Sequence, residues 1–129
     1  MDRNMWNSGD HPGTTNFGFN EKLPIELVTR TPIEDIKTKT IIPFFGCSFT
    51  YGQGLEYKDT FTNILQRDYF CGTDYLALNL GSIGFSLDGV TRVIHQYYNR
   101  TDIKHSKVLV LNFPPVNRRE FFNHKSIDY

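Results

Sequence analysis

Three short apolar runs alternate with two amphipathic segments after residue 40. The runs at 41–45, 75–80 and 108–111 are almost continuously apolar, and each ends at a glycine or an asparagine, which predicts buried strands. Pro43 suits a strand only near its start, because it lacks the N–H that a central strand donates. The segments between the runs have apolar residues at helical spacing and predict two helices. Their buried faces are expected to hold Phe61, Ile64, Leu65 and Tyr69 in the first, and Leu87, Val90, Ile94, Tyr97 and Tyr98 in the second.

Polar residues and a glycine mark the ends of these helices. Asp59 or Thr60 is placed to cap the first helix and Ser86 to cap the second, and Cys71 with Gly72 ends the first. The resulting order is strand, helix, strand, helix, strand. Continuous apolar strands in this order predict an α/β fold with a parallel sheet that is covered on both faces.

Residues 1–40 lack this regularity. They are rich in Gly, Pro, Asn and Thr, so we expect an irregular N-terminal segment that its aromatic residues hold against a main domain at 41–129. The chain has 129 residues, which suits one domain. Its 39% hydrophobic and 22% charged residues exclude wholesale disorder.

Charge and the absence of apolar spans narrow the function classes. Lys plus Arg and Asp plus Glu both number 14, and this zero net charge argues against a nucleic-acid or an anionic membrane partner. No apolar run reaches the ~20 residues of a membrane span, and the first residues do not form a secretory signal. We therefore expect a cytoplasmic protein.

Cysteine content and loop spacing exclude several kinds of site. Two cysteines are too few for a disulfide scaffold, and we expect Cys47 to pack inward in a turn and Cys71 to lie in the core. No Cys/His cluster has the spacing of zinc ligands. The glycine-bearing loops fit neither a P-loop nor a dinucleotide fingerprint. We expect no metal and no cofactor.

Small and polar residues follow each apolar run. In an open parallel sheet, ligands bind beyond the carboxyl ends of the strands, at the point where the strand order reverses. The loops at 46–52, 79–86 and 112–118 leave those ends. Three such loops together predict a functional site.

The first two loops carry motifs that resemble those of the SGNH (GDSL-like) hydrolases. Residues 46–50 read Gly-Cys-Ser-Phe-Thr where the family usually has Gly-Asp-Ser, a form similar to a branch met in phage and environmental sequences. Asn79 and Gly84 match the second motif, Asn-x-x-x-x-Gly. The resemblance spans about residues 41–119. It implies a three-layer, flavodoxin-like (SGNH-type) parallel sheet, of which this chain supplies the N-terminal half only.

Ser48 and Gly84 are candidate catalytic residues on physical grounds as well. A serine on a tight strand-to-helix turn presents its Oγ above the sheet, and the N–H groups of Ser48 and Gly84 are placed to face a developing oxyanion. Each such donor lowers the barrier to acyl transfer by about 3 kcal/mol. The resemblance implies an ester hydrolase with Ser48 as nucleophile and Gly84 in the oxyanion hole. Its substrate would be a small-molecule ester or an acylated sugar or lipid.

The family's other two motifs are incomplete. The Asn of the third motif, Gly-x-Asn-Asp, would fall on Pro115, so Asn112 and Asn117 are the nearby candidates for its role. Arg118 is a candidate for binding an anionic substrate. The fourth motif, Asp-x-x-His, supplies the general base and has no match. His11 is a candidate base, although it lacks the Asp three residues before it.

Two classes of function therefore stay open. The first is a hydrolase whose base comes from a further C-terminal segment, a partner chain or His11. The second is a catalytically inactive SGNH-like binding or assembly module, or a truncated fragment of a hydrolase. We expect His95 on a helix surface and His105 in a turn. The third strand would form an unpaired apolar edge, which predicts self-association into a homo-oligomer.

Overall fold

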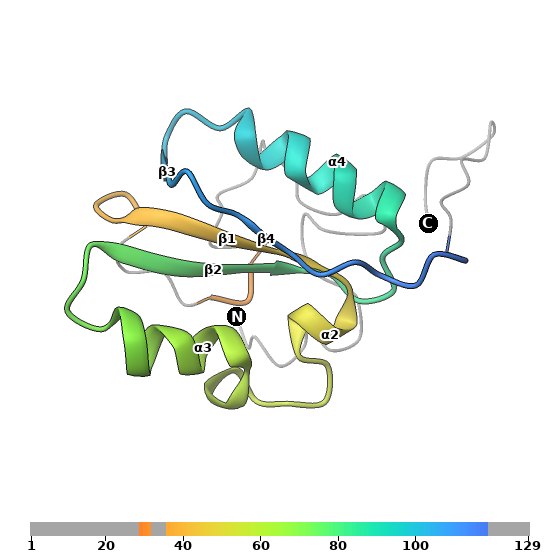
Figure 1. Cartoon of the computed structure of the whole chain (residues 1–129), viewed down its shortest axis with the longest axis horizontal. Helices are drawn as coiled ribbons and strands as arrows, with labels where there is room; N and C mark the ends of the chain where they lie inside the picture. Colours follow the sequence, from red (N-terminus) through yellow and green to blue (C-terminus); the bar gives the residue numbers. More distant parts are fainter. Residues whose placement is uncertain (1–28, 32–35, 119–129) are drawn as a thin grey trace.

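The sheet is small, open and parallel, with helices on both of its faces (Figure 1). The computed structural model describes residues 29–31 and 36–118. The strand order is β2-β1-β3, and β4 also pairs with β1, so β1 is central and the strand order reverses there. The strands are β1 (Thr40–Gly46), β2 (Tyr75–Gly81), β3 (Lys104–His105) and β4 (Val110–Leu111). A mixed α/β fold with a parallel sheet is confirmed.

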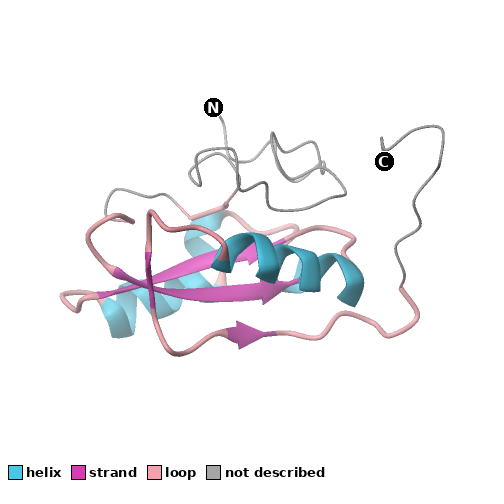
Figure 2. Cartoon of the chain, turned by 90° about the horizontal axis from the view of Figure 1, so that it is seen from above, coloured by secondary structure: helices cyan, strands magenta, loops and turns pink. Residues whose placement is uncertain are grey.

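The helices lie on opposite sides of β1. One face carries α4 and the other carries α2 and α3 (Figure 1), and Figure 2 shows α4 lying along the strands. Successive residues of β1 serve the two faces, because side chains alternate along a strand. The Phe45 ring packs 5.6 Å from the Tyr97 ring of α4, and the Phe44 ring packs 5.7 Å from Phe61 of α3. The helices are α2 (Ser48–Tyr51), η2 (Tyr57–Asp59), α3 (Phe61–Leu65), η3 (Gln66–Phe70) and α4 (Leu87–Tyr98).

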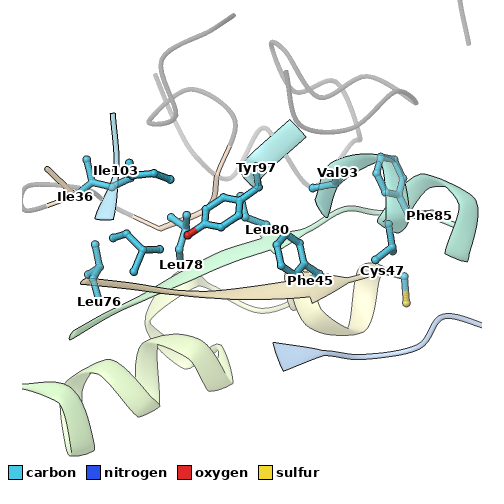
Figure 3. Packing of buried hydrophobic residues seen from close by; sticks show 12 residues of the cluster. Ile36, Phe45, Cys47, Leu76, Leu78, Leu80, Phe85, Val93, Tyr97 and Ile103 are labelled. Carbon is cyan, nitrogen blue, oxygen red and sulfur yellow. The ribbon is translucent and has the colours of Figure 1, made fainter. Parts of the chain in front are cut away.

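The main core lies between the sheet and α4 (Figure 3). The helix begins as predicted, with the Ser86 hydroxyl accepting a hydrogen bond from the Gly89 N–H at 3.3 Å. Its buried face includes Val93. The prediction that Leu87 and Tyr98 are buried is wrong, since they are 39% and 37% exposed. The buried cluster comprises Ile36, Ile41, Phe45, Cys47, Leu76, Leu78, Leu80, Phe85, Val90, Val93, Tyr97 and Ile103.

The first predicted helix has the expected limits but a different buried face. It begins after Thr60, and from Gln66 it continues as a π-helical turn. A π turn holds an extra residue, which rotates the following side chains away from the face set by the α-helical turns. The prediction that Tyr69 is buried is therefore wrong, since it is 71% exposed. Phe61 and Ile64, which precede the π turn, were also predicted to be buried and are each 37% exposed. Cys71, which follows the turn, is also exposed rather than in the core.

The third apolar run does not form one buried strand. Only its last residues, Val110–Leu111, pair with β1, while Val108 is 58% and Leu109 42% exposed. Another short strand, β3, precedes the run and contains His105, which was expected in a turn. The third strand is therefore two short segments separated by a bulge.

Few parts of the N-terminal segment are described. Residues 29–31 are buried against the outer edge of β2, where the Thr29 hydroxyl donates to the Asn79 carbonyl at 2.5 Å. The Thr31 hydroxyl accepts from the Asn79 N–H at 2.8 Å. Residues 1–28 and 32–35 lie outside the described residues. Within the described ranges, no helix combines the length and the apolar content that crossing a bilayer requires.

Candidate functional site

Ser48 occupies a sharp turn between β1 and α2. The strand ends at Gly46, and Cys47 is extended and buried, as expected for a turn cysteine packed inward. Ser48 then begins a helix of four residues, which closes at Gly52 with a φ of +80°. Ser48 is half-buried, and its hydroxyl makes no hydrogen bond to another described residue. The serine thus stands at the carboxyl end of the central strand.

Two glycines allow α2 to lie directly on the strand ends. A Cβ on Gly46 would come within 2.1 Å of the Thr50 hydroxyl oxygen. A Cβ on Gly81 would come within 2.3 Å of the Tyr51 backbone nitrogen. Since neither contact is possible for a larger residue, the close packing of the Ser48 turn on β1 and β2 requires glycine at both positions.

Asn79 is a fully buried side chain that ties this turn to β2. Its Nδ2 donates to the Thr50 carbonyl at 2.9 Å and to the Thr62 hydroxyl at 3.1 Å. Its Oδ1 accepts from the Gly81 N–H at 3.0 Å. A buried amide with both ends satisfied fixes the groups it joins. Asn79, which matched the second motif, therefore holds the helix that Ser48 begins.

The loop after β4 is attached to the same turn. The Asn112 N–H donates to the Phe45 carbonyl at 3.0 Å, and its Nδ2 donates to the Thr50 hydroxyl at 2.9 Å. Asn112 thus reaches the Ser48 turn from the side of the third strand. Thr50 is held from one side by β2 and from the other by this loop.

Gly84 lies in the adjacent loop between β2 and α4. The Ser82 N–H donates to the Gly46 carbonyl at 3.1 Å, which joins this loop to the base of the Ser48 turn. The Phe85 N–H then donates to the Ser82 carbonyl at 3.3 Å, and Gly84 has a φ of +79°. This positive φ favours glycine at position 84. Space is not the reason, because an added Cβ would meet nothing within 4 Å.

The other two candidates in the third loop, Arg118 and Asn117, are not hydrogen-bonded to the Ser48 turn. Arg118 reaches the loop of Gly84, where its Nη1 donates to the Phe85 carbonyl at 3.4 Å. Asn117 is exposed in a turn that the Arg118 N–H closes by donating to the Pro115 carbonyl at 3.2 Å. Its side chain makes no hydrogen bond to the described residues around Ser48.

Arg30 is a buried residue of this region that the sequence did not single out. It is 1% exposed, and its guanidinium donates to the carbonyls of Tyr51 at 2.8 Å, of Gly52 at 2.7 Å and of Leu55. It also lies 4.5 Å from the centroid of the Tyr51 ring. Burial lowers the pKa of Arg30 and raises the pKa of Tyr51 to about 12, an effect that the Arg30 charge partly offsets. Arg30 thus stabilises the end of α2 and the loop that follows.

Neither described histidine forms a hydrogen bond with the Ser48 turn. His95 is exposed on α4, as expected. His105 pairs in register with Ile41, at the amino end of β1, and its Nε2 lies 2.9 Å from the Arg100 carbonyl oxygen. At ~3.3 Å per residue, Ile41 is about 16 Å from the end of the strand at Gly46. The candidate base His11 lies outside the described residues.

A metal site is also missing from the part of the chain that the structure describes, where no three His, Cys, Asp or Glu residues are grouped to hold an ion. Comparison of the chain with protein-family models, with curated proteins and with solved structures finds no match. The geometry of the residues around Ser48 is therefore the basis for any proposal about function.

Proposed function

We propose that this chain is a serine ester hydrolase of the SGNH type, with Ser48 as its nucleophile. The observation that supports it most is the contrast at the turn after β1. The Ser48 hydroxyl has no hydrogen-bond partner among the described residues, while Thr50, two residues on, is fixed by buried hydrogen bonds from Asn79 and by Asn112. This arrangement suits acyl transfer. The backbone that carries the nucleophile is held in position, and the hydroxyl itself is not used in a structural hydrogen bond.

The strand order gives this proposal a second support. The order reverses at β1, and in open α/β sheets ligands bind at such a reversal, beyond the carboxyl ends. Ser48, the loop of Gly84 and the loop of Asn112 all lie there. We infer that the sheet is of the flavodoxin-like type and that these loops enclose the substrate.

The proposed chemistry proceeds in two steps. Ser48 Oγ attacks the acyl carbon of an ester while its proton passes to a base, and the alcohol leaves with a proton from that base. Water then attacks the acyl-serine and releases the acid. The N–H groups of Ser48 and Gly84 would stabilise the oxyanion in each step; neither makes a hydrogen bond to another described residue. The substrate would be a small-molecule ester or an acylated sugar or lipid, and no cofactor takes part.

The general base is the part of this chemistry for which the described residues offer no candidate. Loss of the base lowers the turnover of a serine hydrolase on the order of a million-fold. The enzyme then keeps a rate enhancement of ~10³–10⁴ over the reaction in water. This observation favours the second candidate, a catalytically inactive module that binds or assembles through the same fold. The two candidates differ in whether Ser48 forms an acyl-enzyme.

A burst assay separates them. We expect the full chain mixed with a 4-nitrophenyl ester to release up to one equivalent of 4-nitrophenolate rapidly, followed by slower turnover. Ser48→Ala abolishes the burst, while Ser82→Ala, a matched change at a serine in the neighbouring loop, retains it. If the folded wild-type chain shows no burst above the Ser48→Ala background, the hydrolase is rejected and the module is the better account.

A further inference from the structure

Pro43 lies in β1, and the third strand, which comprises β3 and β4, is interrupted at the point opposite this proline. The carbonyls of Ile41 and Phe45 both face the third strand, where they accept from Ser106 at 3.0 Å and from Asn112 at 3.0 Å. Residues two apart on a strand point to the same side, so the backbone of Pro43 faces it too. Proline offers no N–H there, and the ladder is broken at that point.

The break is occupied by a bulge in the third strand. His105 pairs with Ile41 and Val110 pairs with Phe44, so five steps along the third strand match three along β1. The two extra residues bow away from the long strands (Figure 2). The bulge is held by Ser106, whose hydroxyl donates to the Val108 carbonyl at 2.5 Å.

Between this bulge and β1 lies an open hollow of about 390 Å³. This volume falls within the range that small-molecule sites occupy. The walls are largely apolar and come from the amino ends of β1 and β2 and from the bulge: Thr40, Ile42, Tyr75, His105, Ser106, Lys107 and Val108. The hollow is therefore at the opposite end of the sheet from Ser48.

Most polar side chains around the hollow are already engaged. The Thr40 hydroxyl donates to Asp74 at 3.0 Å, and the Ser106 hydroxyl holds the bulge. His105 Nε2 lies 2.9 Å from the Arg100 carbonyl oxygen, while its Nδ1 is buried without a hydrogen-bond partner among the described residues. Lys107 is exposed, and its ammonium has no ion-pair or hydrogen-bond partner among the described residues. An apolar hollow with one available cation beside it favours a ligand with an apolar body and a single negative charge.

The backbone around the hollow argues against an added peptide strand. Of the β1 groups that face the gap, the Ile41 and Phe45 carbonyls are taken, and Pro43 offers only a carbonyl. A peptide strand gains affinity from paired main-chain hydrogen bonds, and here it would find one acceptor. A compact molecule that binds through its apolar surface does not need them.

We propose that this hollow is a binding site for a small apolar monoanion, of the class of aromatic or short aliphatic carboxylates, whose charge lies against Lys107. The site is separate from the proposed hydrolase site and does not depend on Ser48. The apolar body of the ligand packs on Ile42, Tyr75 and Val108.

A titration of the full chain with 2-naphthoate and with its neutral analogue 2-naphthamide tests this proposal, with binding followed by amide chemical shifts. We expect both ligands to perturb Ile42 and Val108, with the carboxylate bound more tightly. Lys107→Met lowers the affinity for naphthoate about fivefold, as for one exposed ion pair, and leaves the affinity for naphthamide unchanged. Lys58→Met, at an exposed lysine on η2, changes neither.

A second pair of variants tests the apolar wall. Val108→Asp places a carboxylate in the wall at a position that is 58% exposed, so the fold tolerates it, and it abolishes naphthoate binding. Val116→Asp, at a valine 92% exposed beyond the other end of the sheet, retains binding. Ser48→Ala binds naphthoate as the wild type does, so failure of the hydrolase would leave this result intact. The proposal is overturned if naphthoate causes no saturable shifts in the hollow, or if both ligands bind equally and Lys107→Met has no effect.

Discussion

Thr50 is the residue through which the Ser48 turn is held in place. Its carbonyl accepts from Asn79 and its hydroxyl from Asn112, each at 2.9 Å. Gly46 leaves room for the Thr50 side chain, because a Cβ on Gly46 would collide with the Thr50 hydroxyl. Since Thr50 lies within the same four-residue helix as Ser48, groups that fix Thr50 also fix the serine.

Replacing Asn79 by alanine tests this support. The change leaves the Thr50 carbonyl and the Gly81 N–H without their partner in buried surroundings. We expect the free energy of unfolding to fall by about 2–4 kcal/mol, measured by urea denaturation. Asn63→Ala is the matched control, because its amide donates to the Lys58 carbonyl at an exposed site, and it should cost less than about 1 kcal/mol. Equal losses in the two variants would contradict the account.

Tyr51 gives the fold a dependence on alkaline pH. Burial raises its pKa from 10.0 to about 12, so the folded state holds the phenolic proton more tightly than the unfolded state does. The associated stability is fully present below pH 10 and is lost as the pH rises toward 12. Each pKa unit corresponds to about 1.4 kcal/mol, so a rise of about two units gives a loss of about 3 kcal/mol.

Urea midpoints measured between pH 9 and pH 12 check this dependence. Tyr97 also has a raised pKa through burial and contributes a fall of the same sign, so the informative quantity is the difference between variants. Tyr51→Phe should show a smaller fall than the wild type, and the exposed control Tyr69→Phe should show the full one. A Tyr51→Phe profile parallel to that of the wild type would refute the assignment.

Sequence patterns located the residues of the site unevenly. The sequence singled out Ser48, Gly84 and Asn112 because each lies in a loop that follows an apolar strand. Arg30 was not, because it lies in a segment without periodicity, and its burial depends on carbonyls more than twenty residues away in the chain. The sequence pattern also could not predict that Asn79 holds Thr50, because this contact forms only when β2 and α2 pack together.

At the scale of elements, the third strand is determined by a residue on its neighbour. β1 accommodates Pro43 in its interior because the missing N–H faces the bulge between β3 and β4. The pattern of the third run alone predicted one continuous strand. The interruption was not predictable from that run, because its cause lies on another strand that pairs with it only in the folded state.

Pro43→Val tests this cause. The substitution supplies the N–H that Pro43 lacks opposite the bulge, so the third strand is able to pair with β1 there. We expect the amide introduced at position 43 to be protected from exchange to an extent approaching that of Leu78, which is buried in β2. Hydrogen exchange followed by NMR measures both. A fast-exchanging amide at position 43 would mean that the bulge persists without the proline and is held by the Ser106–Val108 turn instead.

The long elements followed closely from their patterns, and the short ones did not. β2 and α4 were predicted because their apolar residues recur over seven and twelve residues. The π turn at Gln66–Phe70 changed which side chains of the first helix are buried, and apolar spacing alone carries no sign of such a turn.

At the scale of the whole molecule, the third strand forms an edge of the sheet that no other described strand pairs with. The apolar side chains of Val108 and Leu109 are exposed there, and the net charge of zero gives no general repulsion between copies. The paired segments β3 and β4 are only two residues each, which limits how much of the edge can pair with another chain. We therefore expect association that depends on concentration.

Sedimentation velocity over a range of concentrations measures this association. The wild type should shift toward larger species as the concentration rises, and Leu109→Lys should reduce the shift, because a lysine on an edge opposes pairing. Val116→Lys adds the same charge away from the edge and should reduce it less. A wild-type chain that stays monomeric at every concentration would contradict the prediction.

The central claim is that Ser48 is a reactive nucleophile on a fixed turn, and labelling with a fluorophosphonate probe tests it most directly. The full chain, Ser48→Ala and Ser82→Ala are treated with the probe and their intact masses are compared. The account predicts a single adduct on the wild type and on Ser82→Ala, and none on Ser48→Ala. A folded wild-type chain that takes up no probe, or an adduct that persists in Ser48→Ala, would contradict it.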